Sequence, residues 1–350
     1  MWQVIGQTWA VSLLQHSLES GALAHAYLFV GPAHVGKMTL ALNMAQALNC
    51  VAAERPCLEC VSCQKIAAAN HPDVQIIGLT QNEDSSEAKL IGIDQIKDMQ
   101  HSASLPPFEG NQKVFIIDGA ELLSIEAANC LLKTLEEPAD RMTFILLTIN
   151  DRLLPATVIS RCQRLELPPL STAEVASALV DNCGIDSKQA RLLAGLSHGC
   201  PGWAFSAMAD DSLLQQREEE LNRLLDVLSA ECEERFAYAA RLAAQFGQNK
   251  GTVYEVLDLW LDYWHDLMLV KIGCHDIITN IDRRDRLVEQ ARGYRLDRIK
   301  SFIKSIQSAR EQLHQNVNAR LALEVLMLDI PGKERGGEGD LATVSSIRNG

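Results

Sequence analysis

The first part of the chain alternates short, uniformly apolar runs with segments that repeat apolar residues at helical spacing. Runs at 27–30, 114–117 and 143–148 show almost no polar alternation, whereas residues 40–48 place apolar side chains on one helical face. A strand that is apolar throughout must be covered on both faces, which is typical of parallel sheets. Together with a further strand at 74–77, the pattern predicts an α/β domain.

The pattern changes at Pro168-Pro169, after which helical periodicity dominates. Short helices interrupted by glycine are expected up to about residue 209, and longer amphipathic helices follow. Three apolar stripes mark the longer helices, and we interpret them as the core of a helical bundle. The stripes are Leu214, Leu221, Leu225 and Leu228; Trp260, Tyr263, Trp264 and Met268; and Leu313, Val317, Leu321, Val325 and Leu328 on a last helix.

These patterns divide the chain into three predicted domains and a tail. We place an α/β domain at 1–167, a small helical domain at 168–209 and an all-α domain at 210–331. Residues 332–350 are rich in glycine and charge, which predicts a disordered tail. A chain of 350 residues, 47% of them hydrophobic, is sufficient to build separate cores.

Charge and the lengths of the apolar runs narrow the class of protein. The formal net charge is −13, which argues against binding nucleic acid over the whole surface, because phosphate neutralisation dominates that affinity. No apolar run reaches the roughly 18 residues of a membrane span. We therefore expect a cytoplasmic protein whose contacts with DNA are local or made through partners.

A group of four cysteines follows the first predicted helix of the α/β pattern: Cys50, Cys57, Cys60 and Cys63. Their spacing matches a structural zinc site, in which four thiolates form a tetrahedral shell and leave no position for a catalytic water. Buried apolar cysteines and two disulfides are the alternatives. Disulfides are disfavoured because the N-terminus does not resemble a secretory signal. His71 is a second candidate for the ligand position of Cys50.

A candidate phosphate-binding loop lies between the first strand and the following helix. Backbone amides between Gly31 and Gly36 can cradle phosphates, and Lys37 would reach the outer ones. The hydroxyl that would hold Mg²⁺ is replaced by Met38, whose thioether has no affinity for a hard cation. Thr39 comes one position later, about 100° around the helix, and is expected to point elsewhere.

The second half of a nucleotide site is also incomplete. Asp118 ends an apolar strand, as a metal-holding Walker B aspartate does, but Gly119 follows where active ATPases of this broad class place a glutamate. Glu121 lies close in sequence and is expected to be solvated. Nucleotide binding therefore stays open and hydrolysis is disfavoured, with a loop kept only for packing as the alternative. ATP is a candidate ligand and Mg²⁺ a doubtful one.

Several motifs occur along the chain in a fixed order. They are His25-Ala26-Tyr27-Leu28-Phe29, the four cysteines, His71-Pro72-Asp73, Ile93-Asp94-Gln95-Ile96, Ala128-Asn129, Leu131-Leu132-Lys133-Thr134-Leu135-Glu136-Glu137-Pro138, Ser160-Arg161-Cys162 and the segment 316–324. On these residues, the chain over roughly 4–330 resembles the delta-prime subunits of bacterial DNA polymerase III clamp loaders, a branch of the AAA+ family. The resemblance implies an AAA+-type domain with a zinc module, a helical lid domain and a helical collar domain that oligomerises.

The resemblance also implies a role for individual residues. The subunit would be a largely non-hydrolysing stator that joins gamma/tau and delta subunits and helps load the beta sliding clamp on primed DNA. Arg161 would be an arginine finger for the ATP of a neighbouring gamma subunit, oriented by Ser160; a local ion pair is the alternative. Lys133 would contact primer-template DNA, unless it is only solvated. With Thr148 at the sensor position, the nucleotide-binding set is Gly31, Gly36, Lys37, Thr39, Asp118 and Thr148.

The nearest alternative is an active gamma/tau ATPase of the same loader, which shares the cysteine module and the Ser-Arg-Cys motif. Such a subunit would carry a hydroxyl directly after Lys37, a glutamate directly after Asp118 and a nucleotide-sensing arginine near residues 199–203. The sequence has none of the three. An autonomous branch-migration motor, and a zinc-stapled scaffold that contacts neither nucleotide nor DNA, are further alternatives.

Overall fold

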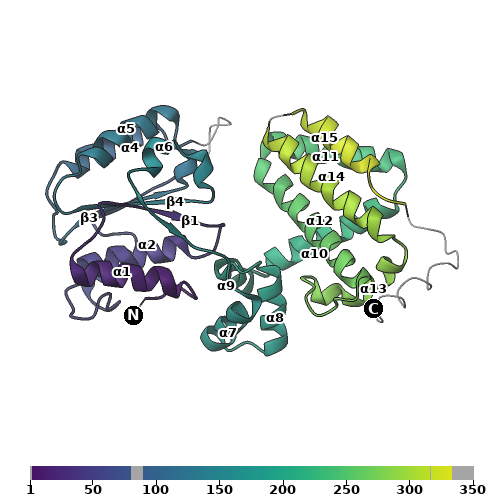
Figure 1. Cartoon of the computed structure of the whole chain (residues 1–350), viewed down its shortest axis with the longest axis horizontal. Helices are drawn as coiled ribbons and strands as arrows, with labels where there is room; N and C mark the ends of the chain where they lie inside the picture. The colour runs from purple at the N-terminus through teal and green to yellow at the C-terminus, as the bar shows by residue number, and fades with distance from the viewer. Residues whose placement is uncertain (1, 80–89, 316, 333–350) are drawn as a thin grey trace, which may run out of the picture. The chain divides into compact units, whose positions relative to one another are not determined.

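The protein separates into two compact units, which are described one at a time (Figure 1). The structure, a computed structural model, describes residues 2–79, 90–315 and 317–332. The first unit comprises Met1–Ala190 and Ser197–Phe205, and the second comprises Arg191–Leu196 and Ser206–Gly350. Apart from Gly332, the predicted tail lies outside the described residues. The boundaries of the three predicted domains stay predictions.

A five-stranded sheet forms the centre of the first unit, and all of its strand pairings are parallel. The spatial order is β2-β3-β4-β1-β5. The strands are β1 (Ala26–Val30), β2 (Val74–Ile77), β3 (Lys113–Asp118), β4 (Met142–Thr148) and β5 (Gln163–Glu166). The four predicted strands are confirmed as β1 to β4. The edge strand β5 has no apolar run to reveal it, because only Leu165 within it is buried.

Helices cover both faces of this sheet, as Figure 1 shows. Tyr27 and Phe29 of β1 belong to the core with α1 and α2, whereas Leu28 and Val30 belong to the core with α4 and α5. Alternate residues of one strand therefore serve two cores, which explains why the strand is apolar throughout. The covering helices are α1 (Thr8–Ser20), α2 (Lys37–Asn49), α4 (Ile93–Ala103) and α5 (Ile125–Glu136). The predicted α/β class is confirmed.

Further helices begin after the third cysteine of the cluster, connect the strands and continue beyond the sheet. They are α3 (Val61–Ala67), η1 (Ala120–Leu122), η2 (Asp151–Leu153), α6 (Ala156–Ile159), α7 (Thr172–Cys183), α8 (Ser187–Leu196) and α9 (Pro201–Ala209). Ser171 begins α7 with a capping box, since its hydroxyl accepts the backbone N–H of Glu174 and the Glu174 carboxylate accepts the backbone N–H of Ser171.

The described part of the second unit is helical and is built around an aromatic core. Trp260, Tyr263 and Trp264 have no exposed surface, and Phe302 packs edge-on against Trp264 at 4.7 Å between ring centroids. The helices are α10 (Asp211–Ser229), α11 (Cys232–Gln248), α12 (Lys250–Lys271), η3 (Ile281–Arg283), α13 (Arg284–Arg292), α14 (Leu296–His314) and α15 (Ala319–Leu328). The predicted all-α C-terminal part is confirmed. No helix in the described residues has the length and apolarity needed to cross a membrane.

One predicted stripe of this bundle is wrong. Leu313 is buried, but it lies on α14, whereas Leu321, Val325 and Leu328 on α15 are each about half exposed. Val317, between the two helices, is also exposed. The core side of α15 is instead formed by Ala322, Leu323, Leu326 and Met327. Because α15 is apolar on nearly every side, its periodicity could not indicate which face is buried.

Candidate functional site

The candidate phosphate loop joins β1 to α2, and its lysine is turned inward. Lys37 Nζ donates hydrogen bonds to the carbonyl oxygens of Gly31 and Pro32, both at 2.7 Å, and the side chain is buried. Burial lowers the pKa of Lys37, while the charges of Glu121 and Asp118 act in the opposite direction. The ammonium group that would meet an outer phosphate is therefore already bonded within the loop.

The start of α9 packs directly on this loop. The backbone N–H of Gly202 donates to the carbonyl oxygen of His34 at 2.9 Å. A Cβ at position 202 would lie only 2.8 Å from that oxygen, so glycine permits this close approach. His34 itself has a positive φ of 61°. The loop is thus held by Lys37 from within and by Gly202 from outside.

Neither of the two residues after Lys37 places a hydroxyl where a phosphate loop would hold Mg²⁺. Met38 packs against the apolar core between the sheet and α1 and α2, which accounts for a thioether at this position. Thr39 is exposed on the next position of the helix. The chain therefore has no hydroxyl at the position where a phosphate loop holds Mg²⁺.

Parallel pairing brings the other predicted nucleotide residues to the same edge of the sheet as Gly31. Asp118 ends β3 beside Leu147, and Thr148 ends β4 next to it. The Thr148 hydroxyl accepts the backbone N–H of Asn150 at 3.1 Å, so it caps the turn after β4. The strands thus bring Gly31, Asp118 and Thr148 together, as their places at strand ends imply.

Glu121 is half-buried, which corrects the expectation that it is solvated. Its Oε1 accepts the backbone N–H of Ile149 at 3.5 Å, and its Oε2 is buried with no hydrogen-bond partner in the described part of the chain. Among the charged groups around Lys37, Glu121 has the largest electrostatic effect on its pKa. The residue lies on the 3₁₀ turn η1, which sequence spacing did not reveal.

The four predicted zinc ligands come together in the structure. Their Sγ atoms all lie within 4.8 Å of one another: Cys50, Cys57, Cys60 and Cys63. Tetrahedral zinc with bonds of about 2.3 Å requires sulfurs about 3.8 Å apart, so the cluster fits this metal after a small contraction. All ten cysteines are free, so the alternative of two disulfides is not found.

Backbone groups around the cluster are arranged to favour thiolates. The backbone N–H groups of Cys57 and Cys60 point at the sulfurs of Cys50 and Cys57, at 3.4 and 3.3 Å. Hydrogen bonds from the backbone N–H groups of Cys60 and Glu59 lower the pKa of Cys57 to about 6, whereas burial raises the pKa of Cys63 to about 12. Four adjacent thiolates, two of them on the buried residues Cys50 and Cys63, need a cation to be stable.

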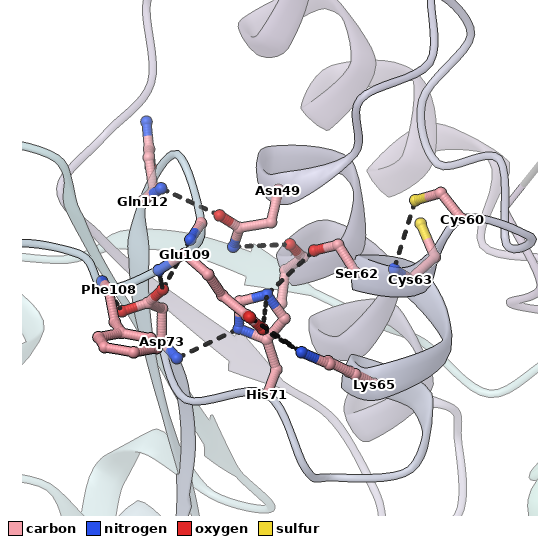
Figure 2. Close-up of polar contacts among 12 residues, drawn as sticks. Asn49, Cys60, Ser62, Cys63, Lys65, His71, Asp73, Phe108, Glu109 and Gln112 are labelled. Carbon is pink, nitrogen blue, oxygen red and sulfur yellow. Dashed lines mark hydrogen bonds and ion pairs between the residues drawn. The ribbon is translucent and has the colours of Figure 1, made fainter.

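His71 lies in a separate hydrogen-bond network that anchors the cysteine module to the sheet (Figure 2). Its Nδ1 accepts the backbone N–H of Asp73 at 3.1 Å, and its Nε2 lies 3.0 Å from the hydroxyl of Ser62 on α3. Burial lowers the pKa of His71, which favours the neutral ring. Both ring nitrogens therefore have partners, and the ring is bonded away from the sulfur cluster.

The carboxylate of Asp73 organises the loop before β3 in the same network (Figure 2). It accepts the backbone N–H groups of Phe108, Glu109 and Gly110 at 2.7, 2.9 and 2.7 Å. Burial opposes ionisation, but these three hydrogen bonds hold the pKa of Asp73 below its usual value. The Phe108 side chain on this loop is 85% exposed.

The two predicted basic residues lie near the surface of the first unit. Lys133 is exposed on α5. Arg161 follows α6 and has a side chain that is 33% exposed. Its guanidinium forms an ion pair with Glu136, with Nη2 to Oε1 at 2.5 Å, and Nη1 donates to the carbonyl oxygen of Thr157 at 2.8 Å. The local ion pair that was the alternative for Arg161 is therefore present.

Comparison with known proteins identifies the family. Residues 6–171 match the family model "DNA polymerase III, delta subunit", and residues 212–331 match "DNA polymerase III, delta subunit, C terminal". The DNA polymerase III subunit delta' of Bacillus subtilis (strain 168) is 30% identical over 319 residues, which cover 91% of this chain and 94% of that protein. The chain belongs to the DNA polymerase III delta-prime family. The resemblance noted from its motifs is confirmed.

Other similarities to this delta-prime family member are more limited. DNA polymerase III subunit tau of Bacillus subtilis (strain 168) is 36% identical over 216 residues, which cover 61% of this chain and 37% of that protein. Among solved structures, the "RuvB Holliday junction branch migration motor" of Thermotoga maritima is 17% identical with a TM-score of 0.41, over 90% of this chain and 83% of that chain. Similarity at that level does not bear on function.

Proposed function

We propose that this delta-prime family member is a clamp-loader stator: it joins gamma/tau and delta subunits but does not itself hydrolyse ATP. With these partners it helps to load the beta sliding clamp on primer-template DNA during replication in the cytoplasm. The observation that carries the proposal is a contrast between two basic residues. Lys37, in the phosphate loop, is buried and bonded to its own loop, whereas Arg161 lies at the surface.

The phosphate loop supports the non-hydrolysing half of the proposal. Nucleotide binding would require Lys37 to leave two carbonyl oxygens, with Met38 in place of the Mg²⁺-holding hydroxyl. Gly119 also leaves the position after Asp118 without a carboxylate to polarise water. The site would then keep the shape of a nucleotide site but could not hydrolyse ATP. The residues that keep this shape would be Gly31, Gly36, Thr39 and Thr148.

The exposed apolar face of α15 supports the proposed assembly with other subunits. Leu321, Val325 and Leu328 recur at helical spacing and are 58%, 48% and 58% exposed. Exposed apolar residues in a row are typical of surfaces that another protein covers. We assign this face to contacts between collar domains, in which neighbouring gamma/tau and delta subunits would cover it.

The zinc cluster and Lys133 have supporting roles in this proposal. Zinc held by the four cysteines would be structural, because four thiolates complete its coordination, and it would fix the module that follows α2. Lys133, exposed on α5, would contact a phosphate of primer-template DNA within the assembled loader.

The proposal is tested by reconstituting the loader from purified subunits. The isolated chain should show no ATP turnover, while the loader that contains it should hydrolyse ATP in response to clamp and primed DNA. Arg161→Ala should leave assembly intact and lower this stimulated rate, since an arginine finger contributes about 10³–10⁵-fold at its own site. Arg161→Lys should restore the rate only in part, because an ammonium lacks the planar donor fork.

Two results would count against the proposal. Turnover by the isolated chain would instead indicate an active gamma/tau-type ATPase, the alternative favoured by the 36% identity to tau. If the loader with Arg161→Ala loads clamps at the wild-type rate, the arginine-finger role is wrong. Arg161 would then act only in its local ion pair.

A further inference from the structure

The guanidinium of Arg161 is held on its own subunit by three hydrogen-bond acceptors. Nη2 donates to Oε1 of Glu136, the last residue of α5, at 2.5 Å. Nη1 donates to the carbonyl oxygen of Thr157 in α6 at 2.8 Å. The Ser160 hydroxyl lies 3.5 Å from the same Nη1. The terminal nitrogens of the fork, which a phosphate group would meet, are thus both engaged within this subunit.

A carboxylate and a phosphate bind a guanidinium through the same N–H donors. Both present paired oxygens that match two N–H donors, so one fork cannot fully serve both at once. They are also both negatively charged, and they would repel each other if they shared the fork at close range. A triphosphate approaching Arg161 therefore competes with the Glu136 carboxylate.

The exposure of the pair makes such a competition feasible. The side chains of Arg161 and Glu136 are 33% and 50% exposed, and solvent-exposed ion pairs contribute little net stability. The contact can define where the guanidinium rests and still yield to a more highly charged partner. A buried pair would instead resist exchange, because separating it would leave an uncompensated charge.

We propose that Glu136 is a positioning residue for Arg161. It holds the guanidinium on its own subunit until a triphosphate bound to the adjacent subunit takes its place. This inference rests on the proposed arginine-finger role of Arg161. It follows that Glu136 weakens the apparent binding of ATP at the neighbouring site, because the carboxylate must first be displaced.

The chain offers a matched control next to Glu136. Glu137 has the same charge and is also exposed, and in the described part of the chain its side chain has no ion pair with an arginine or lysine. Glu136→Gln removes the charge and keeps the size of the side chain. Glu137→Gln makes the same change in net charge without touching the fork, so a general electrostatic effect would appear in both variants.

The test uses a reconstituted loader whose only intact ATP site is the one that faces Arg161. Steady-state ATPase rates would be measured against ATP concentration for the wild type, Glu136→Gln, Glu137→Gln, Arg161→Ala and the double variant Glu136→Gln with Arg161→Ala. Glu136→Gln should lower the apparent KM for ATP by up to about fivefold, the range of an exposed ion pair, and leave kcat unchanged. Glu137→Gln should match the wild type, and Glu136→Gln should have no effect once Arg161 is alanine.

Each contrary outcome has a distinct meaning. A lower kcat with an unchanged KM in Glu136→Gln would overturn the competition and make Glu136 a fixed support of the finger. A KM change that persists without Arg161 would place the effect elsewhere, and an unchanged KM would remove the role of Glu136 alone. If Arg161→Ala hydrolyses ATP like the wild type, the arginine finger fails and the role of Glu136 fails with it.

Discussion

The phosphate loop and the four-cysteine cluster lie one after the other in the sequence, and both are recognisable ligand-binding motifs. They differ in whether other groups of the protein already make the contacts that a bound ligand would otherwise make. In the phosphate loop, two backbone carbonyls accept the Lys37 ammonium, and Gly202 closes on the loop from outside. In the cluster, four sulfurs lie within 4.8 Å of one another, and the hydrogen bonds they accept come from backbone N–H groups, which carry no full positive charge. A motif therefore indicates a bound ligand more strongly where the protein leaves the charge of its ligand atoms uncompensated.

Loss of one cysteine ligand should have the strongest effect of the four changes considered. Cys60→Ser should lower the bound zinc and loosen the module of residues 50–63, because structural zinc contributes on the order of 10 kcal/mol in small zinc domains. Metal analysis and limited proteolysis would measure both changes. Cys183→Ser, at an exposed cysteine outside the cluster, should leave both unchanged. If wild-type protein purified without chelators contained no metal, the contrast between the cluster and the phosphate loop would be wrong.

The second prediction concerns closure of the phosphate loop by α9. Gly202→Ala places a Cβ 2.8 Å from the His34 oxygen, so this variant should lose about 1–3 kcal/mol of unfolding free energy. Chemical denaturation would measure the loss. The control is Gly247→Ala in α11, where a Cβ meets nothing within 4 Å and helix propensity should give a small gain. Equal stability of wild type and Gly202→Ala would show that the loop and α9 are not tightly packed.

The third prediction separates a structural lysine from a ligand-binding one. Lys37→Ala should lower the free energy of unfolding by about 1–3 kcal/mol, because a buried and a partly buried carbonyl oxygen lose their donor. It should not alter affinity for ATP in a fluorescence titration of the isolated chain. The exposed Lys133→Ala is the control for loss of charge and should leave stability nearly unchanged. A fall in ATP affinity with unchanged stability would mean that the loop is open to nucleotide.

The smallest effect concerns the network that anchors the cysteine module. Because the pKa of Asp73 is lowered by folding, its carboxylate contributes stability above its unfolded pKa near 3.8 and loses it as the pH falls through the lower folded value. Asp73→Asn should therefore cost about 1–2 kcal/mol near neutral pH, and the difference from wild type should shrink in acid. Denaturation between pH 7 and about 2 would measure this, with the exposed Asp140→Asn as control. A difference that does not change with pH would exclude the carboxylate as the cause.

Apolar patterning, motif order and cysteine spacing were enough to predict the strands β1 to β4, the parallel α/β class, the family resemblance and the four clustered cysteines. These features are local, since continuous apolar runs require burial on both faces and close spacing brings thiols together whatever the rest of the fold.

The contacts that these local features make arise only in the folded chain. Folding turned Lys37 inward, brought Glu121 toward the loop, paired Arg161 with Glu136 and left Leu321, Val325 and Leu328 of α15 exposed. The Glu121 and Arg161 contacts involve residues 28 and 25 positions away, the exposed face of α15 depends on which side of an apolar helix is covered, and the Lys37 bonds depend on how its own loop folds. Residue spacing within one element carries no information about such partners, because hydrogen bonds, charges and burial depend on distances that only the folded chain sets.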